Sequence, residues 1–314
     1  MAGLLVLTYA ADQLVLGSAR LARHLRISAA VVGVVVIGLG TSAPEFLVSG
    51  TAATTGQADI AIGNLMGSNI INVTLVLGTV AALGGVCTTA TVIAREITLS
   101  VVAVALFAVA AAIGLTIWTG LALLALVVPA LATLVHWSRS DRTAGPIAEQ
   151  TTELTASDDR PSAAAHTWPE SLGRAAAGLI GVLAGAQLLV SNAATIATAF
   201  GVPPLVIGCT LVALGTSLPE LVTAIQAQRR GEADLLVGNL FGSNLFNSLA
   251  GGGIVGICSG THTSPAADLP LLAVMVAASA FAWILLRRNL SIGRPGSIAL
   301  LITYASTVPL LLTT

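Results

Sequence analysis

Two glutamates, Glu45 and Glu220, lie near the middle of otherwise apolar stretches of this sequence. Each ends the same motif, Gly-Thr-Ser-x-Pro-Glu, which occupies residues 40–45 and again 215–220. A carboxylate at the centre of a lipid bilayer costs from about 3 to more than about 10 kcal/mol, so such a residue usually has a function. Two copies surrounded by oxygen atoms predict a cation site. The competing interpretation is a neutral, hydrogen-bonded structural glutamate.

The same motif supplies further oxygen atoms. Pro44 and Pro219 lack a backbone N–H, which breaks the helix and frees a carbonyl one turn earlier. Carbonyls of residues 38–41 and 213–216 are therefore expected to turn toward a bound ion. Irregular backbone at membrane depth is tolerated only where protein or a cavity receives it. The hydroxyl groups of the motif belong to Thr41, Ser42, Thr216 and Ser217.

A second motif, Gly-Asn-x-x-Gly-Ser-Asn-x-x-Asn, occupies residues 63–72 and 238–247. Its polar residues are spaced by four, which places each set along one helix face. Carboxylate, hydroxyl, amide and carbonyl oxygens together suit a hard cation such as calcium rather than zinc or copper, and sodium is similarly hard. The glycines also fit close helix packing. The two polar sets are Asn64, Ser68, Asn72 and Asn239, Ser243, Asn247.

The elements that carry these motifs form a repeat. A shift of 175 residues superimposes the two halves without a gap, and the match extends back to Ala11 and Ala186. The sequence predicts an all-α membrane protein of ten transmembrane helices in two five-helix units. Because each unit has an odd number of spans, the second enters the membrane from the opposite face. Inverted repeats of this kind are typical of secondary transporters, which bind substrate between the repeats.

The composition requires lipid as the solvent. Of 314 residues, 55% are hydrophobic and 9% are charged, and the mean hydropathy is +0.94. A spanning helix needs about 20 mainly apolar residues. The stretches that meet this description are 3–23, 29–53, 59–84, 96–115, 117–136, 171–199, 204–227, 234–257, 268–286 and 296–313.

The arginines predict the orientation. The sequence contains no lysine, and its 13 basic residues all fall at or in odd-numbered connections. Positive residues are retained on the cytoplasmic side, so both termini are expected outside the cell membrane. The polar segment 138–170 has no apolar periodicity and is expected to be a flexible cytoplasmic linker between the units 1–137 and 171–314.

Other acidic and sulfur-containing residues have simpler interpretations. Asp12 aligns with Gln187, so the repeat does not require a charge there, and we expect a structural or pathway role. Asp59 and Asp234 are expected to cap helix N-termini. The three cysteines are odd in number and widely spaced, and predict no disulfide framework and no metal-thiolate site.

The two motifs together resemble those of the sodium/calcium exchanger family of calcium:cation antiporters, and the resemblance covers essentially the whole chain. It implies a central four-helix cluster that binds sodium and calcium in alternation, with no cofactor. Some members have an aspartate at the position of Asn247. The ligands carried over by the resemblance are Glu45, Glu220, Thr41, Ser42, Ser68, Asn72, Thr216, Ser217, Ser243 and Asn247, with the carbonyls of Gly38 and Ala213.

Several functions are compatible with this fold. Sodium/calcium exchange by alternating access is the first, and proton- or potassium-coupled exchange of a divalent cation is the second. A passive cation channel needs a continuous pore, which an inverted repeat with broken helices does not favour. An enzyme is not expected, because the four histidines lie at span ends or in loops, away from the motifs. No basic patch indicates nucleic acid as a partner.

Overall fold

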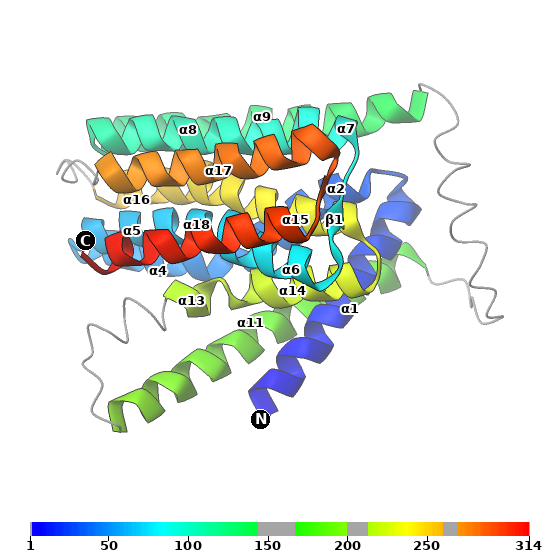
Figure 1. Ribbon diagram of the computed structural model, residues 1–314, viewed down its shortest axis with the longest axis horizontal. Coiled ribbons are helices and arrows are strands. Elements are labelled where there is room, and N and C mark those ends of the chain that lie inside the picture. The colour runs from blue at the N-terminus through cyan, green and yellow to red at the C-terminus, as the bar shows by residue number, and fades with distance from the viewer. Residues whose placement is uncertain (1, 144–166, 200–212, 260–268, 314) are drawn as a thin grey trace.

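The computed structural model describes residues 2–143, 167–199, 213–259 and 269–313, and most of them are helical (Figure 1). Segments marked η are π-helical. The elements of the first half are α1 (Ala2–Leu25), α2 (Ala29–Val32), η1 (Gly33–Gly38), α3 (Leu39–Thr41), α4 (Ala43–Thr54), α5 (Ala58–Ile71), η2 (Asn72–Val76), α6 (Leu77–Gly84), β1 (Val86–Cys87), α7 (Ala90–Val92), η3 (Ile93–Ile97), α8 (Thr98–Ile113) and α9 (Ile117–Thr143).

The second half repeats part of this order. With the shift of 175 residues, α4, α5 and η2 coincide at both ends with α14, α15 and η5. The same motifs therefore fold in the same way twice. The elements of the second half are α11 (Trp168–Ala199), α13 (Ala213–Thr216), α14 (Leu218–Arg229), α15 (Ala233–Phe246), η5 (Asn247–Gly251), α16 (Gly252–Cys258), α17 (Leu269–Asn289), β2 (Ser291–Ile292) and α18 (Arg294–Thr313).

Helix overlaps every predicted membrane stretch, although the ends differ. In the described residues, five helical stretches are long and apolar enough to cross a membrane, and a sixth is added if a bent pair counts as one span. The pair consists of Ala29–Thr41 and Ala43–Thr54, bent by 44°. The stretch predicted for 204–227 begins outside the described residues. The five continuous candidates are Ala58–Gly84, Ala90–Ile113, Ile117–Ser138, Trp168–Leu189 and Leu269–Asn289.

The ends of the predicted linker are helical. α9 continues to Thr143 and α11 begins at Trp168, so each helix extends into the range predicted for the linker, 138–170. The rest of that range, 144–166, lies outside the described residues, as does Cys209. The other two cysteines, Cys87 and Cys258, are free thiols.

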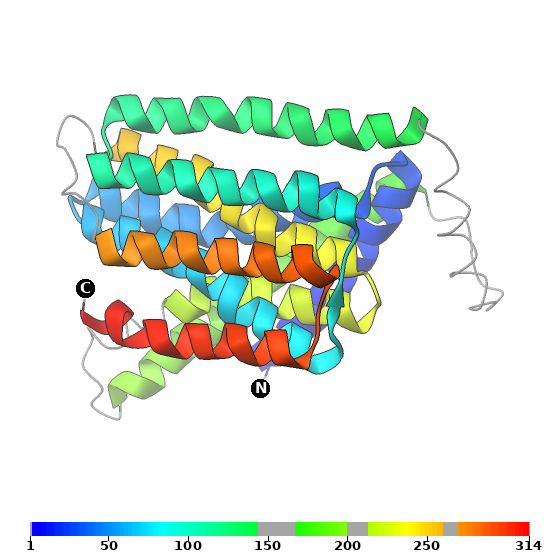
Figure 2. The same cartoon turned by 45° about the horizontal axis from the view of Figure 1, so that its top comes forward.

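The helices that carry the motifs lie in the interior. Every residue of α15 from Leu235 to Phe246 is buried. The stretch Ala58–Gly84 is 78% buried, whereas Ile117–Ser138 is 22% buried and Leu269–Asn289 is 39% buried. A helix that is apolar all round belongs in a core, and the more exposed helices present their apolar faces to lipid. Figures 1 and 2 show α8, α9, α17 and α18 running roughly parallel along the length of the molecule.

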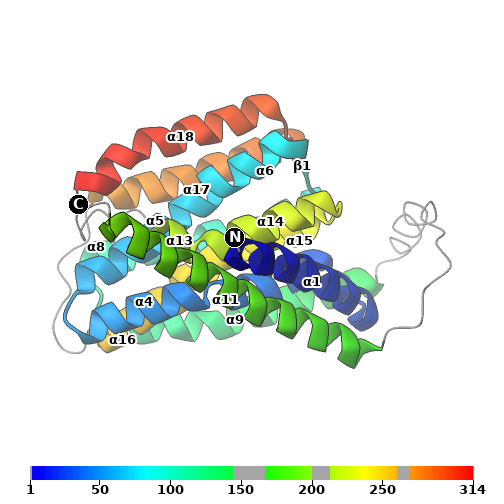
Figure 3. The ribbon, with the colours of Figure 1, turned by 90° about the horizontal axis from the view of Figure 1, so that it is seen from below.

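α1 and α11 form a pair on the face of the molecule away from α8 and α9 (Figures 1 and 3). They contact each other extensively, and α1 also contacts α14. Gly17 of α1 allows this close approach, because a Cβ at that position would lie 2.6 Å from the backbone nitrogen of Ala175. Small residues at such crossings let two membrane helices pack closely.

Candidate cation site

A helix break positions each glutamate of the first motif. Ser42 separates α3 from α4 with a φ of −78° and a ψ of 0°, and Ser217 separates α13 from α14 with nearly the same angles. Pro44 and Pro219 lie in the first turn of the new helix, where a missing N–H leaves no helical hydrogen bond unmade. The break predicted from the prolines is therefore present in both halves, and each glutamate lies in the first turn of the helix that follows it.

Glu45 is fully buried, and only one of its two carboxylate oxygens has a hydrogen-bond partner. Its Oε1 accepts a hydrogen bond from the Ser68 hydroxyl at 3.4 Å, and its carboxylate also interacts with Thr216 of the other half. Its Oε2 is buried and has no hydrogen-bond partner. One carboxylate oxygen is therefore held in place and the other remains available to a ligand.

Glu220 has the corresponding environment. The Ser243 hydroxyl lies 3.2 Å from its Oε1, the carboxylate interacts with Thr41, and its Oε2 is buried without a partner. Each glutamate thus contacts a serine from its own half and a threonine from the other. The two carboxylates are also close enough to repel each other, which a bound cation between them would relieve.

Hydroxyl and carbonyl groups join the two halves at this point. Ser217 Oγ lies 3.5 Å from Ser68 Oγ, and Thr41 Oγ1 lies 3.4 Å from Ser243 Oγ. Ser243 Oγ is also 3.2 Å from the carbonyl oxygen of Gly38, which accepts a second hydrogen bond from the backbone of Ser42. The structure therefore brings hydroxyls of both motifs into one buried cluster, and Ser42 Oγ is buried without a hydrogen-bond partner.

Asn72 and Asn247 each follow a serine of the cluster by four residues, about one turn along the same helix face. Each begins a π-helical segment, η2 or η5. Such segments are rare and often occur at functional sites. Both side chains are fully buried. The Oδ1 of Asn72 has no hydrogen-bond partner, and neither amide atom of Asn247 has one.

Several buried oxygens of the cluster therefore lack any protein partner. They comprise one oxygen each from Ser42, Glu45, Asn72, Glu220 and Asn247. Buried polar atoms are nearly always hydrogen-bonded, and unpaired oxygens from both halves have the chemistry needed to coordinate a cation. The described residues contain no group of three or more His, Cys, Asp or Glu side chains that could hold a metal. The set is a mixture of oxygens that a hard cation prefers.

The remaining predicted residues have distinct places. Ala213 begins α13, and its side chain is not described. Asn64 and Asn239, the first members of the two polar stripes, bond to neighbouring helices: Asn64 Nδ2 donates to Ser49 Oγ at 3.0 Å and Asn239 Nδ2 to Thr223 Oγ1 at 2.9 Å. They attach α5 to α4 and α15 to α14, and so hold each serine against its glutamate. Asn239 Oδ1 also accepts a hydrogen bond from Thr41 Oγ1 at 3.3 Å.

Three polar residues beside the cluster were not assigned from the sequence. Asn69 and Asn244 occupy equivalent positions in the second motif, and Ser248 follows Asn247. All three are buried: Asn69 donates to Ser248, and Asn244 accepts a hydrogen bond from Asn72. Their place in the motif was visible in the sequence, but their partners come from the other half and depend on how the halves pack.

The other predicted acidic residues lie outside the cluster. Asp12 forms a bidentate ion pair with Arg230, with both oxygens 2.7 Å from a guanidinium nitrogen, so α1 is attached to the end of α14. Asp234 lies in the first turn of α15, where its Oδ1 accepts a hydrogen bond from Thr88 at 3.2 Å. Asp59 lies in the first turn of α5. The N-cap residues of α5 and α15 are Gln57 and Glu232, with no side-chain cap hydrogen bond, so the expectation that Asp59 and Asp234 are the caps was wrong.

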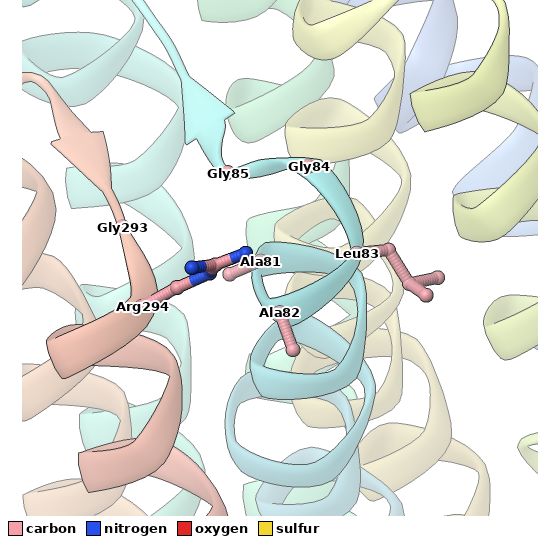
Figure 4. Close-up of a pocket in the computed structure, with 7 residues that line it drawn as sticks. All are labelled: Ala81, Ala82, Leu83, Gly84, Gly85, Gly293 and Arg294. Atoms are coloured by element: carbon pink, nitrogen blue, oxygen red, sulfur yellow. The ribbon is translucent and has the colours of Figure 1, made fainter.

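A surface pocket of about 350 Å³ lies between α6 and the start of α18 (Figure 4). Arg294 extends toward Ala81 across it, and Leu83 points away from α18. The pocket shares no residue with the oxygen cluster and its only charged lining residue is basic. It is unsuited to a cation.

The profile of the family described as "Sodium/calcium exchanger protein" matches residues 1–135 and 171–312, which include both motifs and both halves of the cluster. The chain belongs to this family. It is a multi-pass integral membrane protein of a transporter family, and its sequence match stops on either side of the segment 136–170.

Relatives and solved structures agree with this assignment. The chain is 39% identical to the putative antiporter CaxA of Alkalimonas amylolytica over 80% of this chain and 76% of CaxA. It is 36% identical to the inner membrane protein YrbG of Escherichia coli over 93% and 89% of the two chains. The structure of the sodium-calcium exchanger NCX_Mj, soaked with sodium and calcium, superimposes with a TM-score of 0.82 and 32% identity over 98% of this chain and 95% of that one.

Proposed function

We propose that this protein exchanges sodium for calcium across the cell membrane, and that both ions bind in turn to the oxygen cluster. The observation that carries the proposal is the pair of buried glutamates, each with one oxygen held by a serine and the other without a partner. Membership of the exchanger family supports the choice of ions. No cofactor takes part.

The ligands come equally from the two halves. Glu45 and Glu220 supply the charge, and the neutral oxygens complete the shell. Calcium accepts six to eight oxygen ligands at about 2.3 to 2.6 Å, a number that side chains of one helix alone do not provide. The neutral ligands are Thr41, Ser42, Ser68 and Asn72 with the Gly38 carbonyl in one half, and Thr216, Ser217, Ser243 and Asn247 with the Ala213 carbonyl in the other.

Charge explains why the two ions alternate. Two carboxylates balance one calcium or two sodium ions, and either load leaves the cluster neutral. Calcium and two sodium ions together would leave an excess of two positive charges. At about 4 Å and an effective dielectric constant of about 20, each unbalanced like-charge pair costs about 4 kcal/mol. Simultaneous binding is therefore unfavourable, as exchange requires.

Alternating access follows from the arrangement of the helices. The ten spans form two inverted five-helix units, and the site lies between them. α1 and α11 pack on each other and serve as the gate group, which rocks against the motif helices and opens the site to one side at a time. Both termini are outside, and the linker within 138–170 is cytoplasmic.

Transport under different gradients tests this function. Proteoliposomes that contain the purified protein are loaded with a high concentration of sodium, of potassium or of protons, at equal osmolarity. They are diluted into a medium with a low concentration of the same ion, and calcium uptake is measured. Uptake driven by the sodium gradient, and absent with the other two, is the expected result. Uptake driven by protons or potassium alone would instead support the second candidate function, coupled exchange without sodium.

A further inference from the structure

The orientation of the Asn72 amide decides whether it can bind a cation. An asparagine presents to the site either its carbonyl oxygen, which can coordinate a cation, or its NH₂ group, which repels one. Rotation by about 180° exchanges the two at little steric cost. A ligand asparagine in a buried site therefore needs a neighbour that fixes the rotation.

Asn244 occupies that position for Asn72. The Nδ2 of Asn72 donates to Asn244 Oδ1 at 3.0 Å, and the Nδ2 of Asn244 donates to the backbone carbonyl of Asn69 at 3.0 Å. A backbone carbonyl only accepts, so it fixes the rotation of Asn244, which in turn fixes that of Asn72. The oxygen of Asn72 is then the atom left without a partner. All three residues are fully or almost fully buried.

The second half lacks the corresponding contact. By the repeat, Asn69 is the equivalent of Asn244 and Asn247 the equivalent of Asn72. Asn69 Nδ2 instead donates to Ser248 Oγ at 3.1 Å, and neither amide atom of Asn247 has a partner. The sequence explains the difference, because Ser248 stands where the first half has Val73, which offers no acceptor.

We propose that Asn244 is a positioning residue that turns the oxygen of Asn72 toward the bound ion, whereas Ser248 diverts Asn69 and leaves Asn247 without such a support. The proposal rests on the assignment of Asn72 as a ligand in the proposed function. By this proposal the two equivalent asparagines differ: a neighbour fixes the rotation of the Asn72 amide, and no neighbour fixes that of Asn247.

The test compares Asn244→Ala with Asn69→Ala in proteoliposomes. Both variants remove a buried amide at equivalent positions, but only the first removes the partner of a proposed ligand. Loss of a residue that orients a metal ligand typically weakens affinity about 10- to 100-fold. We expect Asn244→Ala to raise the calcium concentration at half-maximal uptake about tenfold or more. The value for Asn69→Ala should stay within about twofold of wild type.

A double-mutant cycle separates positioning from a general structural effect. If Asn244 acts through Asn72, adding Asn244→Ala to Asn72→Ala should change the half-maximal calcium concentration little, since the ligand is already absent. A full effect of Asn244→Ala in that background would overturn the positioning role and leave the ligand assignment intact. Wild-type affinity in Asn72→Ala would overturn both. Should Asn244→Ala fail to fold, Asn244→Leu, which is closer in volume, replaces it in the same cycle.

Discussion

At the scale of single residues, charge and hydrogen bonding distinguish the two halves of the site. Each half contributes one glutamate, one oriented serine and one asparagine that begins a π-helical segment. Asn247 differs from Asn72 because no partner holds its amide. With both asparagines neutral, the two glutamates alone set the charge of the site, and exchange of two sodium ions for one calcium moves no net charge.

Substitution of Asn247 by aspartate should change this balance. Asn247→Asp adds a third carboxylate, which strengthens cation binding and offsets the charge of a third sodium ion. We expect exchange by the variant to become electrogenic, while wild-type exchange is electroneutral. The measurement is calcium uptake at a series of imposed membrane potentials together with the reversal potential. A wild-type reversal potential corresponding to three sodium ions per calcium would show that this charge count does not govern coupling.

The glutamates and their motif neighbours could be recognised from the sequence because burying a carboxylate in lipid requires compensation. The hydrogen-bond partners could not be recognised in the same way. The contacts of Thr41 with Glu220 and of Asn72 with Asn244 cross between halves. These contacts depend on which faces of two broken helices meet. Residue spacing in the sequence describes only one helix at a time, so it does not predict them.

At the scale of elements, close packing of η1 against α15 holds the two halves of the site together. A Cβ at Gly242 would lie 2.6 Å from the Cα of Val34, and a Cβ at Gly38 would lie 2.9 Å from the backbone nitrogen of Ser243. Glycine at both positions lets the backbones approach, which brings the Gly38 carbonyl to Ser243 Oγ. These glycines are therefore structural supports of the site.

Gly242→Ala should separate these two elements. The three atoms nearest to the added methyl group are the Cα, Cβ and Cγ1 of Val34, at 2.6 to 3.1 Å, so η1 must move away. Overpacking of this kind typically costs about 1 to 3 kcal/mol, and we expect a lower unfolding temperature in detergent and weaker calcium binding. Gly173→Ala is the control, since its methyl group meets no described atom within 4 Å. An equal unfolding temperature for wild type and Gly242→Ala would contradict the packing argument.

The helix breaks at Ser42 and Ser217 were predictable because proline dictates them, but the π-helical segments were not. η2 and η5 follow α5 and α15 without interruption, and no residue type marks the wider turn. The spacing by four predicts polar side chains along one helix face. It holds from Ser68 to Asn72, and the wider π-helical turn begins at Asn72. The sequence thus indicated the proposed ligands on this helix but not the change of helix type at the last of them.

At the scale of the whole molecule, the arginine-bearing helix ends lie at one end of the bundle. Arg230 and Arg23 form ion pairs with Asp12 and Glu232, which joins the ends of α1 and α14. The start of α18, with Arg294, lies beside β2, and the C-terminal end of α18 lies at the opposite end of the molecule (Figures 1 and 2). This agrees with the expected retention of basic residues on the cytoplasmic side.

Cysteine labelling in intact cells tests this topology. In a variant without the native cysteines, a single cysteine within 144–166 should be protected from an impermeant thiol reagent, and one at Thr314 should react. The prediction follows from the arginine distribution, from which we expect both termini outside. Labelling that found the two positions on the same face would mean an even number of spans between them in place of the five expected in the second unit, and would contradict this topology.

The inverted repeat was the feature of the whole molecule most open to prediction, because the same residues recur at a constant shift. The coincidence of α4, α5 and η2 with α14, α15 and η5 follows from that recurrence. The packing of α1 against α11, which are equivalent helices of the two units, and the ion pair of Asp12 with Arg230 were not predicted, since the repeat does not say which helix faces meet.

The most direct test of the central claim is sodium-driven calcium uptake by Glu45→Gln and Glu220→Gln in proteoliposomes. Each substitution removes a carboxylate and keeps hydrogen-bonding capacity, so the serine contacts are retained and the protein should remain folded, as judged by its unfolding temperature and elution volume. We predict that calcium uptake by each variant falls to the level of empty vesicles. Near-normal uptake by either folded variant would contradict the claim that both glutamates bind the exchanged ions.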